Sequence, residues 1–347
     1  MREPGYYTKP EIQSQPEVWR KSAARLLSIP SSSLPQIQDY QHIVVTGCGS
    51  TYYQSLWAAV EIERACGIPA RAVPAGELLL SPEAFLHSGH RTLLMAISRS
   101  AETTETVRAL ELFKTGGYGD DVVITCHPER PLGQMASSCI SVPDAQEQSV
   151  AQTRSFSSMM LGVARLISDD HREYLADSLY QTGSSILANM TAIVTHLGRD
   201  LEIQRFVFLG SGPHYGLACE AMLKMKEMAL AESQAFHFLE FRHGPISVLD
   251  GRSLVIALMG SSGHDTKLRV LRDVRRTGAR TLVLSEQGIA GIRDNADDSL
   301  CLDLPESSPW FAPCYLPPLQ MLALERALSN GLEPDSPRHL GAVVREI

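Results

Sequence analysis

The sequence predicts an α/β protein with two tandem domains, each a doubly wound parallel sheet flanked by helices. Apolar strand-like runs alternate with amphipathic helical segments, which is the pattern of a parallel sheet with helices on both faces. A strand–turn–helix unit near the start of the chain recurs about one domain length later, and 347 residues fit two domains of ~150 residues each. We expect one domain over 20–175 and a second over 185–347.

The first half contains a series of strands, each followed by a turn. The expected strands are, in order, 43–46, 71–74, 93–97 and 120–126. An amphipathic helix is expected over 51–66, ending at Gly67. Residues 155–200 are expected to be helical, with a break at Gly183.

The second half repeats the first. The pattern Gly47-x-Gly49-x-x-Tyr52 aligns with Gly210-x-Gly212-x-x-Tyr215, 163 residues later. At the same offset, residues 93–103 align with 256–266, and at a similar offset 122–125 align with 282–285. Three strand–turn matches in the same order indicate an internal duplication, with each copy about one domain long.

Composition excludes several classes of protein. The net charge of -8 argues against broad nucleic-acid binding, which needs a basic face. Seven scattered cysteines without a C-x-x-C pair argue against a disulfide framework or a zinc site, and no histidine has metal-ligand spacing. No apolar run is long enough to span a bilayer, and the polar N-terminus does not resemble a secretory signal. We therefore expect a cytoplasmic protein with no membrane contact, no metal and no cofactor.

Two turns are candidates for binding an anion. In Gly47-Cys-Gly-Ser-Thr51, glycines between a strand and a helix allow a tight turn whose N–H groups point at a ligand, although a plain turn has the same pattern. The missing third glycine disfavours a dinucleotide site. Ser98-Arg-Ser-Ala-Glu-Thr-Thr104 places four hydroxyls at a helix start. One helix cap needs fewer hydroxyls, so we favour a phosphate monoester as the ligand over a simple cap.

Two segments of the second half carry candidate proton-transfer groups. Lys224 and Glu227 lie one turn apart on a predicted helix, where a solvated face is the ordinary alternative. A carboxylate on the inner side of that helix would serve as a base on carbon. His243 precedes Gly-Pro and is therefore expected in a turn, either as a proton shuttle or as an incidental surface residue.

In order along the chain, GCGST, SRSAET, KMKE, RHGP and PRHL resemble motifs of the tandem sugar-isomerase (SIS) domain proteins. The resemblance covers about 20–347 and is strongest to the isomerase half of glucosamine-6-phosphate synthase and to its free-standing relatives. It implies two tandem SIS domains, a small phosphorylated sugar as the substrate, and a homodimer with sites at the subunit interface.

The resemblance also implies roles for individual residues. Glu227 would move a proton between C1 and C2 of the sugar, His243 would open the ring from the neighbouring subunit, and Lys224 would lie near the substrate amine. Backbone groups of the segment 149–156 would meet the substrate. The residues that would bind the sugar and its phosphate are Cys48, Gly49, Ser50, Thr51, Ser98, Arg99, Ser100, Thr103, Val150 and Ala151.

The sequence departs from the family pattern in three places. Arg99 and Ala101 stand where the synthase motif has Gln and Gly, and an Arg is suited to pair with phosphate. Ala342 replaces the tail lysine that handles the open-chain carbonyl in the synthase, so a mechanism that needs this lysine is not expected. Residue 2 is Arg rather than the cysteine of a glutaminase half, so we expect no use of glutamine.

These observations predict an enzyme that converts glucosamine 6-phosphate into fructose 6-phosphate and ammonia. Aldose–ketose isomerisation without deamination and fructosamine-6-phosphate deglycation remain alternatives, because they need the same phosphate anchor, base and ring opener. A non-catalytic sugar-phosphate sensor is an alternative of another class. The missing tail lysine favours the sensor, whereas Glu227 and His243 favour the enzyme, since pure binding needs neither a base nor a ring opener.

Overall fold

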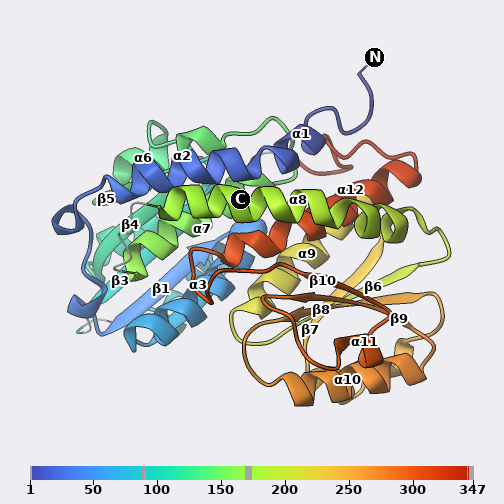
Figure 1. The fold of residues 1–347 in the computed structure, drawn as a ribbon. Coiled ribbons are helices and arrows are strands. Elements are labelled where there is room, and N and C mark those ends of the chain that lie inside the picture. Colours follow the sequence, from blue (N-terminus) through green and yellow to red (C-terminus); the bar gives the residue numbers. More distant parts are fainter. Residues whose placement is uncertain (1, 88, 90, 169–173, 342, 344–347) are drawn as a thin grey trace. The chain divides into compact units, whose positions relative to one another are not determined.

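The computed structural model describes residues 2–87, 89, 91–168, 174–341 and 343. It forms two compact units, each built around its own sheet (Figure 1). The first-sheet unit consists of Glu17–Glu147 and Arg154–Tyr180, with the end of the chain from Gly341. The second-sheet unit consists of Met1–Pro16, Gln148–Thr153 and Gln181–Leu340.

The first sheet has five parallel strands in the order β2-β1-β3-β4-β5. The strands are β1 (His42–Gly47), β2 (Ala70–Pro74), β3 (Thr92–Ser98), β4 (Gly119–Thr125) and β5 (Ser138–Ser141). The helices that begin in this part of the chain are α3 (Ser50–Cys66), α4 (Ala75–Leu80), α5 (Thr104–Thr115), α6 (Pro131–Met135) and α7 (Arg154–Ile167), with the 3₁₀ helices η1 (Ser31–Ser33), η2 (Ile37–Asp39), η3 (Pro82–Ala84) and η4 (Pro143–Ala145).

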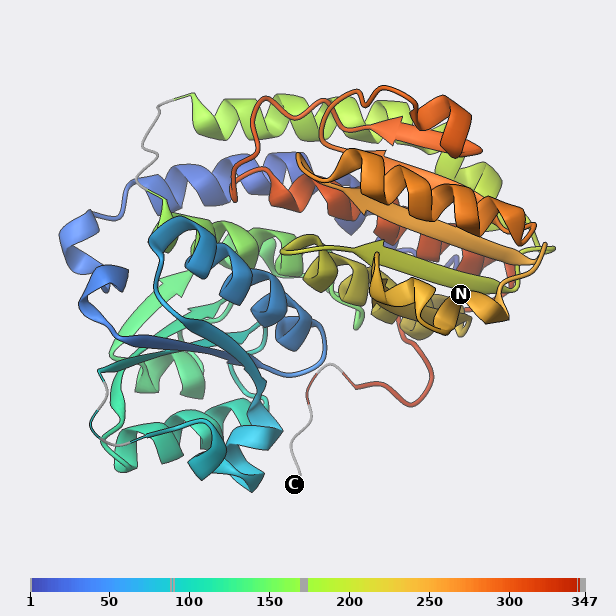
Figure 2. The same cartoon turned by 90° about the horizontal axis from the view of Figure 1, so that it is seen from below.

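The sheet is covered by helices on both faces, as the alternation of strands and helices predicts (Figure 2). On one face, Val44 and Leu94 pack in a buried cluster with Leu110 and Phe113 of α5. On the other face α7 lies close to the strands, because a Cβ at Gly162 would come within 2.9 Å of Ile124. This two-sided burial explains why the central strands are apolar almost throughout.

The second sheet repeats this plan with the order β10-β9-β8-β6-β7, again all parallel. Figure 2 shows α10 lying along this sheet. The strands are β6 (Arg205–Gly210), β7 (Glu232–His237), β8 (Ser253–Met259), β9 (Arg280–Ser285) and β10 (Asp298–Cys301). The helices are α1 (Thr8–Gln13), α9 (His214–Ala229), α10 (His264–Arg276), α11 (Ile292–Asn295) and α12 (Leu316–Ser329), with η5 (Glu240–Arg242), η6 (Pro245–Val248) and η7 (Ala312–Tyr315).

The internal duplication is confirmed by topology. Strands β6, β8 and β9, which carry the three sequence matches, occupy the same places in the second sheet as β1, β3 and β4 in the first. Both sheets have the doubly wound order in which the connections leave the two central strands in opposite directions. The predicted α/β fold class, with two parallel sheets flanked by helices, is therefore confirmed.

Two segments distant in sequence complete the second-sheet unit. The carboxylate of Asp335 accepts hydrogen bonds from the Thr8 backbone N–H at 2.8 Å and from its hydroxyl at 2.7 Å. The buried carboxylate of Glu11 accepts a bond from the Ser149 N–H at 3.2 Å, and the Val150 N–H donates to the Asp335 carbonyl at 3.0 Å. These bonds hold α1 and residues 148–153 in place.

The predicted break at Gly183 is wrong. Helix α8 (Leu175–Arg199) runs through this glycine without interruption. Helix α7, which ends at Ile167, is a separate helix, as is α2 (Gln15–Leu27). Glycine inside a helix costs about 1 kcal/mol of helix stability relative to alanine, and the burial of an apolar stripe outweighs this cost.

Among the described residues, no helix is both long and apolar enough to cross a membrane.

The strand-to-helix turn after β1 depends on Gly47. A Cβ at this position would lie 2.5 Å from the Thr51 Oγ1 and 2.7 Å from the Thr51 carbonyl carbon. We expect Gly47→Ala to lower the free energy of unfolding by about 1–3 kcal/mol through overpacking. Gly76→Ala in α4 is the matched control, because no described atom lies within 4 Å of its Cβ position. Denaturant unfolding that finds the two variants equally stable would contradict this account of the turn.

Candidate functional site

The turn after β1 is closed by its own hydroxyl. The Cys48 N–H donates to the Thr51 Oγ1 at 2.9 Å, and this hydroxyl donates to the Cys48 carbonyl, also at 2.9 Å. Gly49 has φ +56°, and no described atom lies within 4 Å of its Cβ position, so the outer side of the turn is open. Ser50 is buried at the start of α3. The turn therefore offers an accessible backbone at a helix N-terminus, where an anion is favoured.

The Ser98–Thr103 turn lies beside it. In the register of β1 and β3, Thr46 is paired with Ala96, so both turns leave the same edge of adjacent strands. The Cys48 Sγ lies 3.5 Å from the Thr106 hydroxyl of α5, and burial raises the pKa of this thiol. The structure thus brings the two predicted anion-binding turns together at the point where the strand order reverses, which is where doubly wound sheets bind ligands.

The hydroxyls of this second turn organise its backbone. The Ser98 hydroxyl accepts a bond from the Ala101 N–H at 3.1 Å, and the Ser100 hydroxyl accepts one from the Glu102 N–H at 3.2 Å. Ala101 has φ +52°, in the left-handed region that favours glycine, the residue found in the synthase motif. Thr103 is the N-cap residue of α5 but makes no side-chain cap bond to any described residue. The simple capping alternative is therefore not realised at Thr103.

Arg99 has a partner that sequence reasoning missed. Its Nη1 lies 3.4 Å from the Oε1 of Glu147, whose side chain is fully buried, and the Ser155 hydroxyl donates to the same carboxylate. Glu147 is 48 residues away in sequence, so no local pattern reveals the pair. A direct contact between Arg99 and phosphate stays a prediction, because in this structure the guanidinium is paired with Glu147.

In the second-sheet unit, Lys224 lies buried between two carboxylates of α9. Its Nζ is 3.3 Å from the Oε1 of Glu220 and forms a second ion pair with Glu227. Burial alone would lower the pKa of Lys224, but the carboxylates of Glu220 and Glu227 outweigh it and hold the pKa above its ordinary value. The solvated-face alternative is therefore wrong for Lys224, which is 1% exposed.

Glu227 is the partly accessible member of this triad. Glu220 is fully buried, whereas the Glu227 side chain is 14% exposed and lines a cavity of about 180 Å³. The wall opposite α9 is the C-terminal tail, from Gly331 to Arg338. A carboxylate in this position is placed to meet a small molecule while its inner oxygen is held by an ammonium. Ala342, which replaces the tail lysine, lies outside the described residues.

His243 lies in a turn, as predicted. It follows η5, its N–H donates to the Glu240 carbonyl at 2.9 Å, and Gly244 with φ +123° continues the turn. The imidazole is exposed, and the neighbouring Arg242 pairs with Asp273 of α10 at 2.9 Å. This ion pair anchors the turn on the unit, with the imidazole facing outward from its core.

Val150 and Ala151 belong to the second-sheet unit. The Val150 N–H donates to the Asp335 carbonyl, and Ala151 is buried. Their contact with a substrate stays a prediction.

The structure brings Lys224 and Glu227 together within this unit. It adds Glu220, which sequence reasoning missed and whose i, i+4 spacing to Lys224 was the available sequence signal. Within the described ranges, no group of three or more His, Cys, Asp or Glu side chains is placed to hold a metal ion.

Comparisons with known proteins agree with this architecture. A family model described as the SIS domain matches residues 36–168 and 202–329. An isomerizing glutamine–fructose-6-phosphate aminotransferase of Synechocystis sp. is 29% identical over 96% of this chain, and the chain spans 58% of that relative's length.

Two solved structures match nearly the whole chain. A candidate tagatose-6-phosphate ketose/aldose isomerase of Clostridium novyi NT has a TM-score of 0.89 and 25% identity, covering 99% of this chain and 95% of that one. A glucosamine-6-phosphate deaminase of Thermotoga maritima has a TM-score of 0.75 and 25% identity, covering 97% and 99% respectively. The names of these relatives are those of enzymes that act on sugar phosphates.

The buried triad on α9 makes stability depend on the Lys224 charge. Replacing Lys224 with Met leaves two carboxylates without their cation, and we expect a loss of about 3–5 kcal/mol in the free energy of unfolding. Lys226→Met, on the exposed side of the same helix, is the matched control and is expected within about 0.5 kcal/mol of the parent. Denaturant titration of both variants checks this, and equal stability would show that the triad is not held as described.

Proposed function

The chain belongs to the SIS domain family and is an enzyme of the phosphosugar isomerase group, and on that premise we propose that it deaminates an amino-sugar phosphate. The proposed reaction takes glucosamine 6-phosphate and water to fructose 6-phosphate and ammonia. The observation that carries this proposal is the buried Lys224 ammonium, which holds the Glu227 carboxylate at the edge of a cavity. A sensor that only binds a sugar phosphate has no need of such a base.

The phosphate group is assigned to the two turns of the first sheet. Helix N-termini and the hydroxyls of Ser98, Ser100 and Thr103 supply donors that suit the acceptor oxygens of a phosphate monoester. The open outer side of the turn at Gly49 admits the ligand to the backbone N–H groups. Because these turns contact only the phosphate group, they do not distinguish between substrates with different substituents at C1 and C2.

The chemistry at C1 and C2 is assigned to the second-sheet unit. His243 assists opening of the sugar ring, and Glu227 removes the proton from C2 of the open-chain aldose and returns it to C1. Carbon C2 then carries an imine, to which water adds, and the carbon–nitrogen bond breaks to leave the C2 ketone and ammonia. The Lys224 ammonium fixes the reacting carboxylate throughout.

Aldose–ketose isomerisation without loss of nitrogen is a second candidate. The specific observation in its favour is the higher TM-score of the Clostridium novyi structure, 0.89 against 0.75 for the deaminase. The same proton transfer between C1 and C2 performs both reactions. They differ only in whether C2 bears a hydroxyl or an amine, and therefore in whether water must release ammonia afterwards.

The test of the deaminase proposal is ammonia release matched by fructose 6-phosphate formation, from the purified chain and glucosamine 6-phosphate. Glu227→Gln is expected to lower kcat by about 10²–10⁴-fold while substrate still shifts the thermal unfolding midpoint. Glu232→Gln, which alters an exposed ion pair with Arg205, is the control and should retain activity. Turnover of tagatose 6-phosphate without turnover of the amino sugar would establish the second candidate instead.

The phosphate assignment predicts a change in KM. Removing two donors to a charged group in the double variant Ser100→Ala/Thr103→Ala is expected to raise KM about tenfold or more. Ser33→Ala, an exposed hydroxyl outside the turns, is the control. If the double variant has the same KM as the parent chain, the phosphate does not bind at this turn.

We further propose a cytoplasmic homodimer in which each site receives His243 from the neighbouring subunit. Mixing inactive Glu227→Gln chains with inactive His243→Ala chains is then expected to restore some activity, because one of the two sites in each mixed dimer has both Glu227 and His243. Subunit exchange is verified by native mass spectrometry of differently tagged chains. Complete exchange without recovery of activity would place both groups within one subunit.

A further inference from the structure

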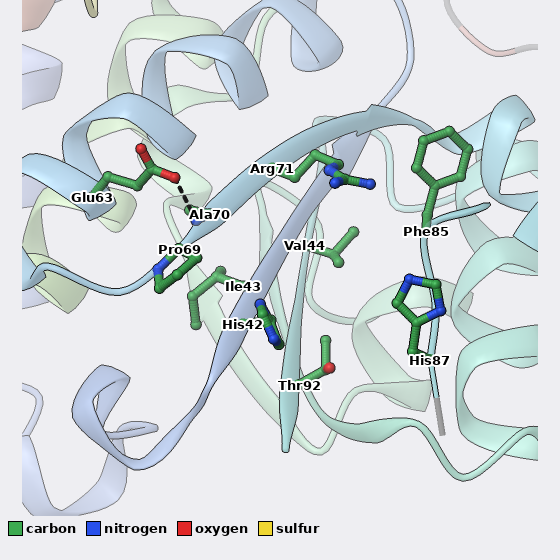
Figure 3. Close-up of a pocket in the computed structure, with 10 residues that line it drawn as sticks. All are labelled: His42, Ile43, Val44, Glu63, Pro69, Ala70, Arg71, Phe85, His87 and Thr92. Carbon is green, nitrogen blue, oxygen red and sulfur yellow. Dashed lines mark hydrogen bonds between the residues drawn. The ribbon is translucent and has the colours of Figure 1, made fainter. Parts of the chain in front are cut away.

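A second cavity lies in the first-sheet unit, at the edge where the strands begin. Its volume is about 410 Å³, within the range of small-molecule sites. Figure 3 shows the side chains around it. Its lining includes Val44, Glu63, Arg71, Phe85, His87 and Thr92.

The cavity exists because the helical cover of this sheet face is short. The chain that follows β2 forms only the six-residue α4 and the single turn η3 before it returns to β3. The cavity lies beside this short cover, and the amino-terminal ends of β1 and β3 contribute Val44 and Thr92 to its lining. Val44 and Thr92, which are 4% and 5% exposed, form the apolar floor.

The walls combine an aromatic ring with cationic and imidazole groups. Half-buried Phe85 stands on one side, and the guanidinium carbon of Arg71 lies 5.9 Å from the centre of its ring. Among the described residues, Arg71 makes one hydrogen bond, from Nη1 to the Ala84 carbonyl at 3.3 Å, which leaves further N–H donors at the cavity. Figure 3 shows the imidazole of His87 on the side of Phe85 and that of His42 nearer Thr92.

Glu63, the acidic residue of the lining, is hydrogen-bonded to the backbone of Ala70. The Glu63 Oε1 accepts a bond from the Ala70 N–H at 2.9 Å, at the end of the cavity away from Phe85 (Figure 3). Among the described lining residues, the part of the cavity next to Arg71 and Phe85 thus has guanidinium donors and an aromatic face, and Glu63 is the only carboxylate. This arrangement suits a flat ring that carries a negative charge.

We propose that this cavity binds a small aromatic carboxylate. The ring of the ligand packs between Phe85 and the floor at Val44, where an aromatic pair gains more than its buried area alone. The carboxylate meets the guanidinium of Arg71, whose planar donors match it with two parallel bonds. The site is separate from the phosphate turns, because it lies where β1 and β3 begin and the turns lie where they end.

Isothermal titration of the full chain with benzoate tests the proposal. Saturable binding is expected, and Arg71→Gln is expected to weaken it about tenfold through loss of a charge-assisted hydrogen bond. Arg91→Gln is the matched control, since Arg91 is also exposed and stacks on Tyr40 but does not line the cavity. Absence of saturable binding by the parent chain, or equal binding by Arg71→Gln, would overturn the proposal.

Further experiments test the separate parts of the proposal. Benzyl alcohol, which lacks the charge, and cyclohexanecarboxylate, which lacks the aromatic ring, should each bind more weakly than benzoate. Phe85→Leu should remove the preference for the aromatic acid while keeping an apolar wall. The double variant Ser100→Ala/Thr103→Ala should bind benzoate as the parent chain does. Weaker binding by this variant would place benzoate at the phosphate turns and refute a separate site.

Discussion

The parallel direction of all five strands in each sheet is the constraint on which the rest of the structure depends. Parallel strands deliver every following loop to one edge, and the reversal of strand order leaves a gap between the loops of the two central strands. In the first sheet those loops are the turns at Gly47 and Ser98, each of which opens a helix. An anion at this edge would meet two helix N-termini at once, and this is the electrostatic basis of the phosphate site that we propose.

The second copy uses the equivalent edge differently. His214 begins α9, and a Cβ at Gly260 would come within 2.4 Å of its ring, so the imidazole fills the space after β8. The ring nitrogen lies 3.3 Å from the Oε1 of Glu286. Burial alone would raise the pKa of Glu286, but His214, Ser307 and Lys267 hold it below its ordinary value. Duplication preserved the strand order, while side chains of the chain itself came to occupy the place that the first copy leaves open.

Helix α9 shows how burial is reconciled with charge. An ammonium inside a protein is stable only when carboxylates or other acceptors replace its water, and Glu220 and Glu227 do so from the same helix. Because Glu220 is fully enclosed and Glu227 is not, the triad presents one carboxylate to a cavity and fixes it from behind. Residues 331–338 of the C-terminal tail complete that cavity and therefore lie beside Glu227, the proposed base.

The sequence by itself determined the local features: strands β1 to β4 with their counterparts β6, β8 and β9, the helix that ends at Gly67, the positions of the two turns and the duplication. These follow from periodicity and turn chemistry within a few residues. Tertiary structure decided the pairing of Arg99 with Glu147, the burial of Lys224 and the continuation of α8 through Gly183. Each of these depends on which groups distant in sequence become neighbours, because burial and electrostatic partners belong to the packed chain and not to any local segment.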